Sequence, residues 1–139
     1  MSFALDARLV ADTIEIGDLG LSRLLLMNDA RYLWLILVPR QESLSELVDL
    51  DPRDRTILME EIAGVSKALI GLPGVDKINV GALGNIVRQL HIHVVARSSR
   101  DAAWPGPVWG AGTPQRYDSQ RAFEIARDLK AQLIRDAAA

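Results

Sequence analysis

The residues best suited to do chemistry lie together in the run Gln89-Leu90-His91-Ile92-His93, which holds both histidines of the chain. In a β-strand, successive side chains point to opposite faces of the sheet. A strand here would place Gln89, His91 and His93 on one face and the two apolar residues against the core. Alternate side chains lie roughly 6.5–7 Å apart. One imidazole could then attack a phosphorus atom while its neighbour binds a phosphate oxygen.

An imidazole is largely neutral near pH 7 and can act as a nucleophile. Attack by His91 would divide a difficult displacement into two easier steps through a phospho-histidine-type intermediate. Two other interpretations stay open. The histidines could form an exposed polar surface without a role, or they could bind a metal. A catalytic zinc needs a third protein ligand, which Asp, Glu or Asn would have to supply because the chain has no other His and no Cys. We expect neither a metal nor a cofactor.

The composition is that of an ordinary globular protein, with 139 residues, 49% hydrophobic residues and a formal net charge of -2. We expect a single domain over residues 1–139. The charge gives no overall attraction to nucleic acid or to an anionic membrane, so neither is expected as a partner. The absence of cysteine suits a reducing, cytoplasmic location. The apolar stretch from Leu24 to Pro39 is interrupted by Asn28-Asp29-Ala30-Arg31 and is too short to span a membrane.

Five strands are expected where runs of Leu, Ile and Val are bounded by turn residues. They cover residues 13–17, 22–27, 32–38, 76–82 and 88–96. Asn28-Asp29 provides turn chemistry between the second and third strands, which predicts an antiparallel hairpin. The segment from Arg100 to Pro114 is rich in proline and glycine and is expected to be a loop.

The helices are expected between and after these strands. A short helix is predicted in the first dozen residues, and the run Ser43-Leu44-Ser45-Glu46 resembles a capping box for another. A long central helix should follow Asp51-Pro52, an N-cap and a proline at the first helical position. A last helix should start near Asp118 or Ser119. Its expected buried residues are Phe123, Ala126, Leu129 and Leu133. The order predicts an α+β domain with an antiparallel sheet and helices on one face.

The segment from Asn79 to Val95 resembles the signature of the histidine triad (HIT) family, whose pattern is His-φ-His-φ-His-φ-φ with φ apolar. In that family an Asn-x-Gly and a Gly-rich turn precede the histidines, as they do here. Leu35 to Arg40 is similar to its apolar strand ending in Pro-Lys or Pro-Arg, and Trp104-Pro105 resembles the Trp-Pro segment of its nucleoside phosphoramidate hydrolases. The resemblance implies a HIT-like sheet of about five strands with a long central helix and a C-terminal helix.

The resemblance also implies roles for the polar run. His91 matches the middle histidine, which attacks the α-phosphorus of a nucleotide and forms a nucleotidyl-histidine intermediate. His93 matches the last histidine, which binds phosphate oxygens. Gln89 stands where the family has its first histidine. An amide can position a group by hydrogen bonds but cannot act as an acid, so the chain resembles a divergent branch with Gln-x-His-x-His.

Five further residues are matched to substrate-binding positions of the family. Gly84 and Asn85 match the turn beside the phosphates, where backbone N–H groups can bind an anion. Asn79 matches an asparagine that contacts phosphate or sugar. Asp29, or Asn28 beside it, falls near the acidic residue that binds the ribose hydroxyls.

The resemblance implies a hydrolase or transferase acting on a nucleotide conjugate, such as a nucleoside phosphoramidate or a dinucleoside polyphosphate. The alternative is a nucleotide- or anion-binding module with little or no catalysis. Trp104 and Trp109 either pin the Pro-rich loop in place, or Trp104 closes the active site, possibly of a second subunit, as its counterpart does in related dimers. Under both interpretations a homodimer is expected.

Overall fold

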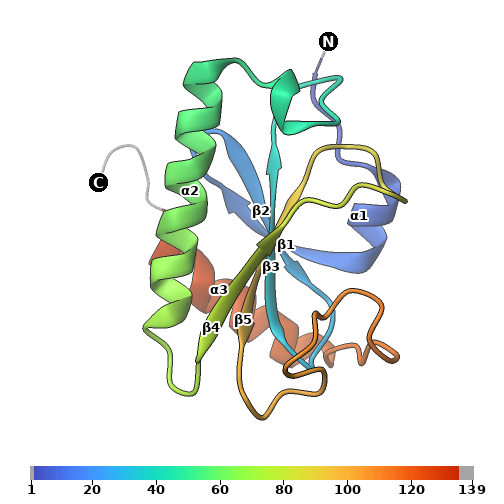
Figure 1. The fold of residues 1–139 in the computed structure, drawn as a ribbon, viewed down its shortest axis with the longest axis vertical. Coiled ribbons are helices and arrows are strands. Elements are labelled where there is room, and N and C mark those ends of the chain that lie inside the picture. Colours follow the sequence, from blue (N-terminus) through green and yellow to red (C-terminus); the bar gives the residue numbers. More distant parts are fainter. Residues whose placement is uncertain (1, 135–139) are drawn as a thin grey trace.

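A five-stranded antiparallel sheet forms the centre of the protein (Figure 1). The structure is a computed structural model and describes residues 2–134. The strands are β1 (Thr13–Asp18), β2 (Ser22–Met27), β3 (Leu33–Pro39), β4 (Lys77–Gly81) and β5 (Ile92–Arg97). They lie in the order β1-β2-β3-β5-β4, with every neighbouring pair antiparallel. The sheet and its helices confirm the expected α+β fold.

The helices are α1 (Ala7–Asp12), the 3₁₀ turn η1 (Leu47–Asp49), α2 (Pro52–Ile70) and α3 (Ser119–Leu133). The long helices begin at the expected caps. The carboxylate of Asp51 accepts a hydrogen bond from the backbone N–H of Asp54, and that of Asp118 accepts one from Arg121. Each cap satisfies a backbone donor that the first helical turn leaves unpaired. None of the helices in residues 2–134 combines the length and the hydropathy that a membrane crossing requires.

The sheet is covered on both faces, which explains why consecutive residues of β2, β3 and β5 are buried, as in Leu24–Leu26 and Val94–Ala96. Helices α2 and α3 pack on one face (Figure 1). The main contacts there come from Leu24, Leu26, Leu35, Leu37, Leu58, Val65, Leu69, Ile92, Val94 and Leu129. The other face is covered by the N-terminal segment, α1 and the Pro-rich loop. Its main contacts come from Phe3, Leu5, Leu9, Leu25, Trp34, Ile36, Val38, Val95, Val108 and Trp109.

Two expectations for the helices were wrong. Phe123 of α3 is 59% exposed, and Ala122 is buried instead, because the buried stripe of α3 runs through Ala122, Ala126 and Leu129. The capping box at Ser43 does not form. Ser43 has a positive φ of 61°, and the carboxylate of Asp49 accepts hydrogen bonds from the backbone N–H groups of Ser45 and Glu46.

Strand β5 is shorter than expected, since it begins at Ile92 rather than near residue 88. The backbone N–H of Leu90 donates to the carbonyl oxygen of Leu44, 2.9 Å away, and the carbonyl oxygen of Gln89 binds the ring of His91. These groups are therefore not available to a sheet ladder. Of the three polar residues that the sequence placed on one strand, only His93 lies in it.

A buried ion pair organises the loop that follows β5. The guanidinium of Arg97 is 2% exposed and binds both carboxylate oxygens of Asp101, at 2.7 and 3.0 Å. It also donates to the side chain of Asn79 and to the carbonyl oxygen of Gly106. The hydrogen bond from Arg97 lowers the pKa of Asp101 to about 2. The pair thus contributes stability above the usual Asp pKa of about 3.9, and this contribution is lost as the pH falls toward 2.

Replacing Asp101 by Asn should destabilise the protein by about 3–5 kcal/mol, because the charge of Arg97 would stay buried without its partner. The measurement is urea unfolding at neutral pH. Asp128→Asn is the matched control, since Asp128 pairs with Arg127 on the surface and its side chain is 69% exposed. That control should change the free energy of unfolding by less than about 0.5 kcal/mol. Equal effects of the two substitutions would contradict this account of the loop.

Candidate active site

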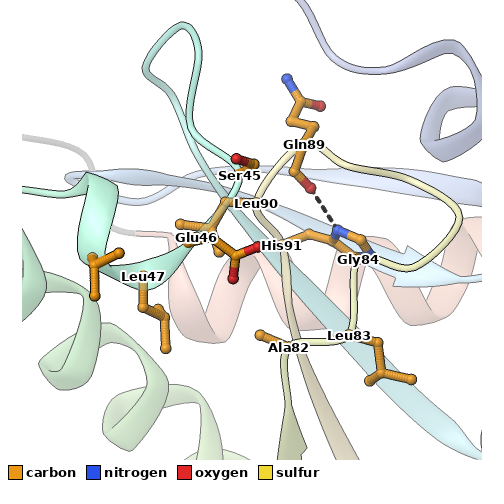
Figure 2. Close-up of a pocket in the computed structure, with 10 residues that line it drawn as sticks. Ser45, Glu46, Leu47, Ala82, Leu83, Gly84, Gln89, Leu90 and His91 are labelled. Carbon is orange, nitrogen blue, oxygen red and sulfur yellow. Dashed lines mark hydrogen bonds between the residues drawn. The ribbon is translucent and has the colours of Figure 1, made fainter.

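His91 precedes β5, and its ring is oriented by the backbone. Nδ1 lies 2.7 Å from the carbonyl oxygen of Gln89 (Figure 2). A carbonyl oxygen can only accept a hydrogen bond, so Nδ1 carries the proton of the neutral ring. The lone pair is then on Nε2, the nitrogen available for nucleophilic attack. The carbonyl oxygen would also stabilise the positive charge that the ring gains on attack.

His93 is held in the opposite tautomer. The indole N–H of Trp34 on β3 donates to Nδ1 of His93 over 2.9 Å. Since Nδ1 accepts, the proton of the neutral ring is on Nε2, and His93 presents an N–H donor. The centroids of the two imidazole rings are 4.9 Å apart. The nucleophilic nitrogen of His91 therefore lies near the N–H donor of His93. This arrangement would allow His91 to attack a phosphorus atom while His93 donates a hydrogen bond to one of its oxygens.

Both histidines are buried, at 7% and 6% exposure, which rules out the alternative interpretation of an exposed polar surface. His93 lies between two indoles: the ring centroids of Trp34 and Trp109 are 5.6 and 5.5 Å from its own. Burial, with a smaller contribution from His91, lowers the pKa of His93 to about 3. His93 is consequently neutral at physiological pH, and its role is restricted to donating a hydrogen bond.

Gln89 does not share a face with the histidines. Its amide oxygen accepts from the backbone N–H of Asp6 at 2.8 Å, and its amide nitrogen donates to the carbonyl oxygen of Ala4 at 2.9 Å. Figure 2 shows the amide pointing away from His91. The side chain at the first position of the motif thus binds the N-terminal segment to the domain, and only its backbone carbonyl oxygen serves the site.

A cavity of about 220 Å³ opens beside His91. Its lining comes from residues 89–91 and from two other segments: residues 45–48, around η1, and residues 82–84, after β4. Gly84 has a φ of 74°, a conformation that residues with a Cβ rarely adopt. The expected turn is therefore present at the cavity. Asn85 next to it is exposed and does not line it.

Asn28 and Asp29 lie at a second cavity, of about 580 Å³, whose lining includes Trp34. Trp34 connects the two regions, because it lines this cavity while its indole N–H binds His93. The polar side chains of the pair are already engaged. Asp29 is 2% exposed and forms an ion pair with Arg31 at 2.8 Å, while Asn28 accepts from the backbone N–H of Tyr117.

The structure places two further expected residues away from the histidines. Asn79 binds the guanidinium of Arg97 at 2.7 Å, and Trp104 lies over the same guanidinium at 5.7 Å. The indole that contacts the site is that of Trp109, which packs against His93 and would make a tight contact of 3.1 Å with a Cβ at Gly81.

Sequence analysis therefore missed Trp34 and Trp109 as site residues. Trp34 is in an apolar strand, where its indole is indistinguishable from core packing. The strand register of the structure explains the contact, because Trp34 pairs with Val95 and so lies diagonally opposite His93 on the same face of the sheet. Within residues 2–134, no three His, Asp or Glu side chains gather into a group that could hold a metal ion.

Comparison with known proteins gives the chain a family context. Residues 8–100 match the model of the HIT domain. No curated protein matches the chain. Among crystal structures, that of a histidine triad protein from Bradyrhizobium japonicum is similar, with a TM-score of 0.91 and 44% identity, covering 97% of this chain and 100% of that one.

Two other crystal structures are equally similar. A histidine triad protein from Sinorhizobium meliloti 1021 has a TM-score of 0.90 and 45% identity, covering 95% of this chain and 97% of that one. One from Marinobacter aquaeolei VT8 has a TM-score of 0.91 and 41% identity, covering 96% and 97%.

The low pKa of His93 predicts an acid-sensitive fold. In the unfolded chain His93 binds a proton near pH 6.5, whereas in the folded chain its pKa is about 3. Between these values the free energy of unfolding should fall with decreasing pH, by up to about 1.4 kcal/mol per unit from this group alone. In Trp34→Phe, Nδ1 loses its donor and is free to accept a proton, so this slope should weaken.

The measurements are urea unfolding at several pH values and NMR of the two imidazole rings. The signals of His93 should stay those of a neutral ring from pH 8 to 5 in the unmutated protein. The Trp34→Phe variant should move the ring toward a mixture of tautomers. Ordinary titration of His93 near pH 6.5 in the unmutated protein would contradict the assignment.

Proposed function

Since the chain belongs to the HIT family, we propose that it hydrolyses or transfers the nucleotidyl group of a nucleotide conjugate through a covalent intermediate on His91. The observation that carries the proposal is the opposite tautomers of the two histidines. One ring presents a lone pair and its neighbour presents an N–H donor. This arrangement fits attack on an α-phosphorus whose oxygen is bound at the same time.

The reaction would proceed in two displacements. Nε2 of His91 attacks the phosphorus, the bond to the leaving group breaks, and the carbonyl oxygen of Gln89 holds the charged ring through Nδ1–H. The Nε2–H of His93 binds a non-bridging oxygen, whose negative charge grows in the transition state. Water or another acceptor then attacks the phosphorus from the vacated side, and the P–N electron pair returns to His91.

The two cavities support a substrate with a small phosphoryl end and a larger second part. The cavity at His91, about 220 Å³, is below the usual range for whole drug-sized ligands, whereas the one beyond Trp34, about 580 Å³, is within it. A nucleoside placed in the larger cavity would lie against the ring of Trp34. Because Asp29 is already paired with Arg31, the ribose would be recognised by groups other than that carboxylate.

The competing function is a nucleotide-binding module with little or no catalysis. It is favoured by one observation: the amide of Gln89 is occupied by the N-terminal segment and takes no part in the site. Such a module would bind AMP without releasing it from any conjugate.

Replacing His91 by Asn should abolish turnover and leave the fold intact. The Asn amide can still donate to the carbonyl oxygen of Gln89, but it has no nucleophilic nitrogen. We expect AMP release from an adenosine 5′-phosphate conjugate to fall at least about 10³-fold. Mass spectrometry of protein quenched during the reaction should show an added nucleotidyl group on the unmutated chain and none on His91→Asn. Binding of AMP to both proteins, with neither an adduct nor turnover, would favour the binding module.

We also propose that the chain forms a homodimer through the outer edge of the sheet. Strand β4 is an edge strand, and apolar side chains beside it are exposed, among them Val80 at 49% and Met59 of α2 at 61%. An unpaired edge next to exposed apolar side chains favours association. A second copy related by a two-fold axis would pair β4 with β4 and cover the two patches together.

Met59→Glu should therefore convert a dimer into a monomer in sedimentation experiments at micromolar concentration, because a carboxylate would be buried at the interface. Phe123→Glu, at an equally exposed apolar residue of α3, is the control and should leave the dimer unchanged. A monomeric unmutated protein would contradict the proposed assembly.

A further inference from the structure

Among residues 2–134, the site has no group placed to protonate a departing amine or alcohol. Both atoms of the Gln89 amide are hydrogen-bonded to the N-terminal segment, at 2.8 and 2.9 Å, and an amide is not an acid at neutral pH. His91 is used as the nucleophile. It therefore cannot carry a proton on Nε2 at the moment when the leaving group departs.

His93 cannot take over this task. A proton could be added only at Nδ1, where the indole N–H of Trp34 already donates. An added proton would also be buried between Trp34 and Trp109, in surroundings that disfavour the charged ring. The low pKa of His93 agrees with this geometry. The ring can donate a hydrogen bond to a phosphate oxygen, but it has no acidic proton to give away.

The remaining titratable side chain at the His91 cavity, among its described lining residues, is that of Glu46. It lies before η1 and is exposed to water, as are its neighbours Leu47 and Val48. Its exposed position contrasts with the buried surroundings in which enzymes place a general acid. No cation lines this cavity within the described residues either.

We propose that the protein is selective for nucleotide conjugates whose leaving group departs as a stable anion, such as a phosphate, polyphosphate, sulfate or phenolate. This inference rests on the proposed nucleotidyl-histidine mechanism and narrows its substrate class. In the first step a P–N bond to His91 forms, the P–O bond breaks, and its electron pair leaves with the oxygen. In the second step water forms a P–O bond, the P–N pair returns to Nε2, and the water proton is released to solvent.

Amines and simple alcohols are poor substrates under this constraint, because each needs a proton as its bond to phosphorus breaks. General acid catalysis typically contributes about 10²–10⁴-fold to a rate. Without a general acid, the rate for amine and alkoxide leaving groups lacks this contribution. The rate for leaving groups that are already stable as anions is unaffected, because they need no proton. Of the two substrate types that the family resemblance suggested, dinucleoside polyphosphates should therefore be favoured and nucleoside phosphoramidates disfavoured.

The test is kcat/KM for AMP release from a series of adenosine 5′-phosphate derivatives that differ only in the leaving group. The series contains the p-nitrophenyl, phenyl and methyl esters and the N-alkyl phosphoramidate, each incubated with the unmutated protein and with His91→Asn. We expect a steep fall from p-nitrophenyl to methyl, with the phosphoramidate at least about 10²-fold below the p-nitrophenyl ester. A phosphoramidate cleaved as fast as the p-nitrophenyl ester would overturn the inference and leave the proposed mechanism standing.

Glu46→Gln is the matched variant. It removes the remaining carboxylate of the cavity and is expected to keep the ratio of rates across the series. A loss confined to the methyl ester and the phosphoramidate would identify Glu46 as a proton donor and overturn the inference. Failure of the proposed mechanism looks different: no AMP and no nucleotidyl adduct would form even from the p-nitrophenyl ester, whose leaving group needs no assistance.

Discussion

The hydrogen bond from the indole of Trp34 to Nδ1 of His93 determines how the pair of histidines can be used. It fixes the proton of His93 on Nε2 and makes a second proton costly. His91 is fixed in the other tautomer by a backbone carbonyl oxygen. Two chemically identical side chains thereby adopt opposite tautomers, one set by a donor and the other by an acceptor. The difference depends on which group lies next to each Nδ1, and not on the histidines themselves.

These contacts need a rigid surrounding, and β5 supplies it from both ends. Before its start, Leu90 forms a hydrogen bond with Leu44, and the ring of His91 forms one with the carbonyl oxygen of Gln89. These hydrogen bonds separate the segment from the sheet and orient the ring of His91 toward the cavity. At its end, the ion pair of Arg97 with Asp101 closes the loop that brings Trp109 against His93. The buried charge of Arg97 is tolerated because its N–H groups find oxygen partners.

Gln89 stands at the first position of the histidine motif, but its side chain binds the N-terminal segment while the fold is kept. A histidine at this position would offer a titratable ring. The amide instead matches a backbone N–H and a backbone carbonyl oxygen of the N-terminal segment, much as a neighbouring strand would. The segment carries Phe3, Leu5 and Leu9 onto the sheet face that also holds Trp34. The residue thus contributes to covering the face of the sheet that carries the histidines, and its side chain does not contact either histidine.

The sequence by itself determined the elements and the nucleophile hypothesis. Apolar runs, helix caps and turn residues depend on local preferences, so the order of strands and helices was predictable. The errors were the start of β5, the burial of Phe123 and the capping box at Ser43. The His-x-His spacing and its flanks indicated the family. Only the tertiary structure decided that the histidines are buried, that Gln89 faces the N-terminal segment, and that Trp34 rather than Trp104 controls His93. Such contacts join residues as far apart as 59 and 85 positions, and local preferences carry no information about them.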